Sequence, residues 1–60
     1  MIIRIKGKLP DHIWDMGVRP GQRYDAHVAP DTNLDARRFI VVVDGQQQYC
    51  TVFPKNYDEI

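Results

Sequence analysis

The chain has one cysteine, Cys50, no surplus of charge and no long apolar run. A single cysteine excludes an internal disulfide, and an unpaired thiol is typical of a reducing compartment. Eight basic and eight acidic side chains give a formal net charge of zero, so a long-range field that gathers polyanions is not expected. No apolar stretch approaches the roughly 20 residues that span a membrane. We therefore predict a soluble, cytoplasmic protein without a membrane partner.

The chain contains residue types that can bind metal ions or act as nucleophiles, but their spacing in the sequence does not match a known metal or catalytic motif. His12, His27, Asp15 and Cys50 are of metal-ligand type, yet no pair has the short spacing of closed zinc sites, so no metal and no cofactor is expected. Cys50 also lies in mid-strand without a neighbour that would activate it as a nucleophile. The glycines are isolated, which excludes a phosphate-binding loop. The pattern favours a binding protein over an enzyme.

Four glycines and four prolines divide the 60 residues into short segments, within which apolar side chains mostly alternate. This spacing is typical of strands, and no helix-length amphipathic run is present. We predict one domain over residues 1–60. A chain of this size buries only about 60% of its unfolded surface, and its core rarely supplies more than roughly 3–5 kcal/mol.

The first half of the chain predicts two strands joined by a long loop. The first strand covers residues 2–6, and the loop covers residues 8–19 and holds one turn of helix. Pro20 and Gly21 suit the central positions of a type II turn, because proline fixes its own φ and glycine accepts the positive φ that follows. A second strand over residues 23–28 comes next. Its core-facing side chains are predicted to be Tyr24, Ala26 and Val28.

The strongest local signal is a hairpin, in which Asp44 and Gly45 separate two β-prone runs. Aspartate followed by glycine is the preferred sequence of a tight type I′ turn. The run before the turn, Phe39 to Val43, is apolar without alternation, which indicates a central strand covered on both faces or a surface used for contact. Pro54 ends the run after the turn, because proline cannot donate to a ladder. The connection that precedes the hairpin, Pro30 to Asp35, is polar and rich in turn formers.

Charges at the two ends of the chain have opposite signs. Arg4, Lys6 and Lys8 lie in a first segment without acids, and Asp58 and Glu59 lie near the other end. If the first and last strands pair, these side chains meet, which predicts a surface salt-bridge cluster.

The segment Phe53 to Tyr57 resembles the closing segment of SH3 domains. In that family the fourth strand finishes with an aliphatic or aromatic residue, proline, any residue, asparagine and tyrosine, and Pro54, Asn56 and Tyr57 match position for position. The order of strands, turns and loops is similar as well. The resemblance implies an all-β fold, a small five-stranded SH3-like barrel with a long first loop and a short 3-10 turn over residues 56–58.

In SH3 domains the proline and tyrosine of this segment line the groove that receives polyproline ligands, and acids of the long loop pair with a basic residue of the ligand. The resemblance implies such roles for Pro54 and Tyr57. Asp11 and Asp15 are the acids of the corresponding loop. The predicted protein-binding site is Asp11, Trp14, Asp15, Pro54, Asn56 and Tyr57.

Trp14 is the only tryptophan of the chain, and tryptophan is enriched at interface hot spots. SH3 domains have a tryptophan at the start of the third strand, but Arg37 and Arg38 stand there, so Trp14 is the candidate to replace it. Alternatively, Trp14 folds back over the open end of the barrel and Tyr57 only packs the closing turn. The leading prediction is a free-standing protein-binding module of bacterial or phage origin, an adaptor or inhibitor whose partner is another protein or peptide.

Two other functions fit the residues. Arg19, Arg23, Arg37 and Arg38 predict a basic sheet face of the kind that holds single-stranded nucleic acid, although the neutral net charge argues against it. The apolar strand over residues 39–43, or an exposed sheet edge, predicts self-assembly into a structural or accessory protein.

Overall fold

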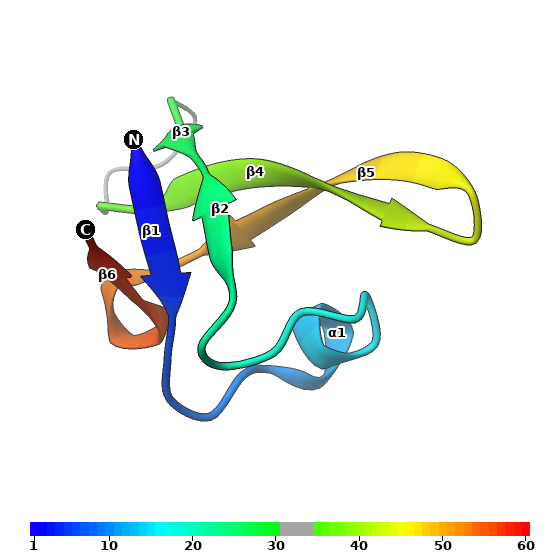
Figure 1. Cartoon of the computed structure of the whole chain (residues 1–60), viewed down its shortest axis with the longest axis horizontal. Coiled ribbons are helices and arrows are strands. Elements are labelled where there is room, and N and C mark those ends of the chain that lie inside the picture. Colours follow the sequence, from blue (N-terminus) through cyan, green and yellow to red (C-terminus); the bar gives the residue numbers. More distant parts are fainter. Residues whose placement is uncertain (31–34) are drawn as a thin grey trace.

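The computed structural model describes residues 1–30 and 35–60, which form two antiparallel sheets of three strands each. Figure 1 shows the two sheets facing each other, with the last hairpin extending well beyond the rest of the molecule. The fold of the described residues is therefore mostly β. The elements in chain order are β1 (Ile2–Ile5), α1 (Asp11–Trp14), β2 (Arg23–Asp25), β3 (His27–Val28), β4 (Arg37–Val43), β5 (Gln46–Val52), η1 (Pro54–Asn56, a 3-10 helix) and β6 (Tyr57–Glu59).

The first sheet has the order β2-β1-β6, with β1 antiparallel to both neighbours. Because side chains alternate along a strand, Ile3 and Ile5 both point into the core, where they are 0% and 1% exposed. The long loop after β1 folds back over the core with α1 as its single helical turn. The turn of helix predicted for this loop is present. It follows Pro10, and Gly17 lies just beyond it with a φ of +88°.

The predicted pairing of the first and last strands is confirmed, and it brings opposite charges together. Asp58 lies opposite Arg4 in the register, and its carboxylate is 2.8 Å from Lys6 Nζ and 3.8 Å from Arg4 Nη2. Glu59 differs from the expectation, because it binds Arg37 of the other sheet at 2.9 Å.

The second sheet has the order β3-β4-β5 and contains the predicted hairpin. Asp44 and Gly45 have φ values of +51° and +79°, the positive values that a type I′ turn needs at both positions. On β4, Phe39 and Val41 are buried, whereas Ile40 and Val42 are 50% and 66% exposed. The apolar run is therefore not covered on both faces.

The predicted second strand is broken at Ala26 into β2 and β3, which belong to different sheets. Ala26 is fully buried at this crossing, and its N–H donates to the carbonyl of Met1 at 2.7 Å. The prediction that Val28 faces the core is wrong, because Val28 is 56% exposed. The change of sheet interrupts the alternation on which that prediction relied. The turn over Pro20 and Gly21 is as expected, with Gly21 at a φ of +91°.

The 3-10 turn near the C-terminus is present but lies at Pro54–Asn56, and β6 already begins at Tyr57. Proline suits the first helical position, where no N–H is needed, which accounts for the earlier start. The two sheets are not joined into a closed barrel by strand pairing among the described residues.

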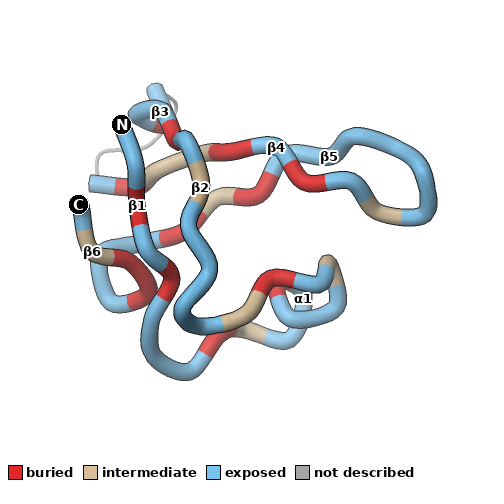
Figure 2. The backbone as a smooth tube through the Cα atoms, viewed as in Figure 1, coloured by how far each residue is buried: buried red, intermediate tan, exposed pale blue. Residues whose placement is uncertain are grey.

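The core lies between the two sheets and the long loop, as the buried positions in Figure 2 show. Both sheets and the long loop contribute side chains to this core, so each sheet buries its inner face against the other sheet and the loop. The predicted polar connection over Pro30 to Asp35 falls mostly outside the described residues. The buried cluster is Ile3, Ile5, Leu9, Ile13, Val18, Ala26, Phe39, Val41, Cys50, Val52 and Tyr57.

Within residues 1–30 and 35–60, no helix is both long enough and apolar enough to cross a membrane.

Candidate functional site

The acids and the tryptophan predicted as binding residues all lie exposed at α1. Asp11 and Asp15 are spaced by four residues, and the N–H of Asp15 donates to the carbonyl of Asp11 at 2.8 Å. Trp14 is 46% exposed and does not enter the core. The guanidinium carbon of Arg19 lies 3.6 Å from the centre of its ring, and Arg19 Nη1 donates to the Trp14 carbonyl at 2.6 Å. Arg19 thus holds the indole on the surface of the loop.

The C-terminal residues of the predicted site are separated by burial. Pro54 is exposed, but Asn56 and Tyr57 are only 2% and 7% exposed. Tyr57 is the register partner of Ile5, and cross-strand partners share a face, so its ring points inward. The Tyr57 hydroxyl donates to the carbonyl of Asp35. Trp14 and Tyr57 are therefore not exposed together, and Tyr57 packs the end of the chain.

Asn56 holds the start of the long loop. Its Nδ2 group donates to the carbonyl oxygens of Lys6 and Lys8, both at 3.1 Å. Its backbone carbonyl also accepts from the N–H of Lys6 at 2.9 Å. This buried side chain therefore serves the fold, because its amide group binds the backbone at the start of the long loop.

The four arginines predicted to bind nucleic acid do not share a face. Arg37 and Arg38 are neighbours on a strand, so they point to opposite sides. Arg37 is bound to Glu59 at 2.9 Å, while Arg38 Nε donates to Thr51 Oγ1 at 3.1 Å. Arg19 is stacked on Trp14. Arg23 is exposed on β2, where it lies opposite Arg4.

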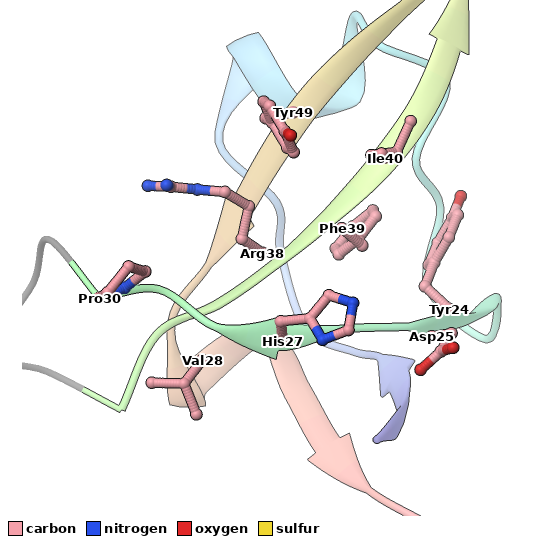
Figure 3. A pocket seen from close by; sticks show the side chains of 9 residues that line it. All are labelled: Tyr24, Asp25, His27, Val28, Pro30, Arg38, Phe39, Ile40 and Tyr49. Atoms are coloured by element: carbon pink, nitrogen blue, oxygen red, sulfur yellow. The ribbon is translucent and has the colours of Figure 1, made fainter.

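A groove of about 630 Å³ lies over β2, β3, β4 and β5, and we name it the aromatic groove. Figure 3 shows side chains from these strands surrounding it, with Phe39 and His27 near the middle and Arg38 and Tyr24 toward opposite ends. Sequence reasoning missed this site except for Arg38. The unbroken apolar run of β4, interpreted either as a central strand covered on both faces or as a contact surface, was the one signal that pointed to it. The groove is lined by Tyr24, Asp25, His27, Val28, Pro30, Arg38, Phe39, Ile40 and Tyr49.

The walls of the groove are aromatic and aliphatic. The rings of Tyr24 and Phe39 are stacked, with centroids 4.1 Å apart and planes 16° apart. Ile40 and Tyr49 are cross-strand partners that are 50% and 71% exposed. Burial raises the pKa of Tyr24, and the nearby Cys50 adds to the shift, so the Tyr24 hydroxyl is neutral at physiological pH. It donates to Gln22 Oε1 at 2.6 Å.

Polar groups stand at the rim of the groove. Arg38 lies 6.0 Å from the centre of the Tyr49 ring, and His27 is its register partner on β3. Asp25 lies at the end formed by β2, where the N-terminal amino group is 3.2 Å from its carboxylate. The groove thus combines an apolar interior with polar side chains at its rim, an arrangement that suits a ligand with both apolar and polar parts.

The backbone of β4 is open along the groove. The pairing of β3 with β4 ends at His27 and Arg38, because the chain leaves for the other sheet at Ala26. Antiparallel pairing alternates, and Val43 and Gln46 form the hydrogen-bonded pair that closes the two-residue turn. By this alternation, the N–H and C=O groups of Ile40 and Val42 point away from β5, toward the side that β3 leaves uncovered.

The arrangement does not activate Cys50. The thiol is 2% exposed, and burial raises its pKa to about 11. It is therefore protonated at neutral pH and lacks the thiolate that a nucleophile or metal ligand needs. Among residues 1–30 and 35–60, no three histidine, cysteine or acidic side chains gather in a way that could hold a metal ion.

Comparisons of the chain with protein-family models, with curated proteins and with solved structures find no match.

Proposed function

We propose that this chain is a protein-binding module, and that the aromatic groove holds an extended peptide segment of a partner protein. The observation that carries the proposal is the exposed apolar surface that lines the aromatic groove. Val28, Ile40 and Tyr49 are 56%, 50% and 71% exposed, and all three line the groove. Apolar side chains gathered at one concave place mark interaction sites on soluble proteins.

An extended peptide fits because the groove offers backbone groups as well as side chains. The open N–H and C=O groups of Ile40 and Val42 suit a strand that continues the line of β3 along β4, a mode of recognition known as β-augmentation. Such a peptide would place an apolar side chain against Ile40, on the face of the sheet that Ile40 shares with Tyr49.

The fold itself is proposed to be SH3-like. If β2 and β3, separated by Ala26 alone, are counted as one bent strand, five strands follow one another in the order that the SH3 resemblance implies. A long first loop, a tight hairpin and a 3-10 turn lie at the corresponding places. The proposed ligand site is nevertheless not the polyproline groove of SH3 domains, because Tyr57 is buried. We picture the module as a cytoplasmic adaptor or inhibitor.

A display library of random peptides tests the function. Peptides selected on the wild-type chain should bind Ile40→Ala and Tyr49→Ala about tenfold or more weakly, which corresponds to about 1.4 kcal/mol. They should bind Trp14→Ala as well as the wild type. In hydrogen exchange, a bound peptide should protect the amides of Ile40 and Val42. Selected peptides that are sensitive to Trp14→Ala alone would move the site to α1, and a library without binders would reject peptide recognition.

Binding of single-stranded nucleic acid is the weaker proposal. Of the four predicted arginines, only Arg38 lines the groove, with His27 beside it. A salt titration separates the two functions, because phosphate contacts make affinity fall steeply as salt rises. A flat response to salt would dismiss nucleic acid and leave the peptide proposal in place.

A further inference from the structure

We propose that the free edge of β5 joins two copies of this chain, so that their β3-β4-β5 sheets form one continuous sheet. In the described residues, β5 pairs only with β4, along its whole length from Gln46 to Val52. Its other edge is therefore available to a further strand. This inference does not depend on the aromatic groove being a peptide site.

The register of the hairpin identifies the backbone groups at this edge. Val43 and Gln46 are the hydrogen-bonded pair next to the turn, and the alternation then repeats every second residue. Gln47, Tyr49 and Thr51 consequently have N–H and C=O groups that point away from β4. These three residues form a regular row of donors and acceptors of the kind that templates strand pairing.

The edge lacks the features with which proteins block such pairing. Charged side chains and prolines normally protect exposed edges, but the stretch from Gly45 to Val52 contains neither. The edge strands of the other sheet differ. β2 carries Arg23 and Asp25, β6 carries Asp58 and Glu59, and each is only three residues long, against seven for β5.

A second copy is the occupant that this edge fits. In a symmetric pair, an antiparallel edge strand meets its own copy about a two-fold axis. With the axis at Tyr49, the two Tyr49 residues lie opposite each other, and Gln47 of each copy lies opposite Thr51 of the other. An aromatic pair and two uncharged polar pairs result, without like-charge repulsion. The open edge of β4, proposed above for a peptide, is shorter, because only Ile40 and Val42 are left uncovered there, against three residues on β5.

The proposed dimer leaves the aromatic grooves on a common face. A two-fold axis perpendicular to the sheet keeps the outer faces of both copies on the same side. Two copies of Tyr49, one from each groove, would then lie near the centre of this face. A partner protein with two binding segments would gain avidity from such an arrangement.

Register-specific charges test the dimer in solution by analytical ultracentrifugation. The double variant Gln47→Glu/Thr51→Glu places like charges opposite each other at both pairs, and we expect at least a tenfold rise in the dimer dissociation constant. The matched variant Gln47→Lys/Thr51→Glu places opposite charges there and should retain the wild-type dimer. Both variants carry Thr51→Glu next to Arg38. Any difference in the folding stability of their monomers therefore comes from position 47 alone. A wild type that remains monomeric at every concentration, or two variants that behave alike, would overturn the proposal.

Disulfide trapping tests the axis at Tyr49 independently. In a Cys50→Ser background, Tyr49→Cys would place two cysteines opposite each other with Cα atoms about 5.5 Å apart, within the range of about 4.4–6.8 Å that a disulfide spans. Val42→Cys in the same background is the control, because Val42 is exposed but lies on β4, away from the free edge of β5. Mild oxidation should link Tyr49→Cys at least tenfold faster than Val42→Cys. Equal rates would contradict the proposed register.

Discussion

The ring of Tyr24 lies almost parallel to the ring of Phe39, with centroids 4.1 Å apart. Tyr24 belongs to β2 and Phe39 to β4, so this stack connects the two sheets through a contact that no strand pairing makes. Both rings also line the aromatic groove. The same pair therefore contributes to stability and shapes the candidate site.

We expect the stack to contribute about 0.5–1.5 kcal/mol beyond the area that the rings bury. A double-mutant cycle with Tyr24→Leu and Phe39→Leu should show a coupling free energy of this size, because leucine keeps apolar volume but removes the stacked rings. Urea denaturation measures the free energy of unfolding of each variant. Val42→Leu, at a position that is 66% exposed on the same strand as Phe39, serves as a control with a change within about 0.5 kcal/mol. A coupling energy of zero would show that the rings act independently.

Replacing Asn56 by alanine should destabilise the fold strongly. The change removes the donor for the carbonyl oxygens of Lys6 and Lys8, and an unsatisfied buried group costs about 1–3 kcal/mol. Asn56→Asp should also destabilise at neutral pH, because an ionised carboxylate cannot donate to carbonyls. Thermal unfolding followed by circular dichroism measures both effects. Lys55→Ala, exposed in the same turn, is the control, and an Asn56→Ala variant as stable as this control would contradict the assigned role.

Gly7 and Gly17 allow a direct comparison of how much stability is lost when glycine is replaced by alanine. Both have positive φ, +74° and +88°, so alanine should cost about 1–2 kcal/mol of backbone strain at either position. At Gly7 the new Cβ would also lie 3.0 Å from the carbonyl oxygen of Lys55, whereas at Gly17 it meets nothing within 4 Å. Chemical denaturation should therefore find Gly7→Ala less stable than Gly17→Ala. Equal losses would mean that η1 shifts freely to make room.

Acid should remove a stabilising contribution from Asp58. The hydrogen bond from Lys6 lowers its pKa, the charges of Lys6 and Arg4 act in the same direction, and partial desolvation opposes them. A carboxyl group with a folded pKa below its unfolded value of about 3.9 stabilises the fold above that value. Its contribution is lost as the pH falls through the folded pKa.

The pH dependence of Asp58→Asn tests this contribution. Below about pH 4, the wild type should lose more stability than the variant, as measured by urea midpoints across a pH series. The difference should be small and should shrink at high salt, because the ion pairs are exposed. Parallel pH curves for the two proteins would contradict a depressed pKa at Asp58.

Much of the local structure was predictable because its causes lie within a few residues. Asp44 and Gly45 require a tight turn wherever they stand between β-prone runs, and Pro54 ends a strand for lack of an N–H. Alternation likewise indicated the first strand over residues 2–6. The candidate site was harder to predict from the sequence. The resemblance to SH3 domains grouped Trp14 with Tyr57, but Trp14 is exposed and Tyr57 is buried.

By itself, the sequence determined the turns, the hairpin and a mostly β chain, since proline, glycine and alternation act through local backbone sterics. Tertiary structure alone decided which faces are exposed. The break at Ala26 sends β2 and β3 to different sheets, exposes Val28 and leaves the edge of β4 uncovered. Pairing with β1 turns Tyr57 inward beside Ile5. These outcomes depend on the register between strands distant in sequence, where burial of the whole core outweighs any local preference.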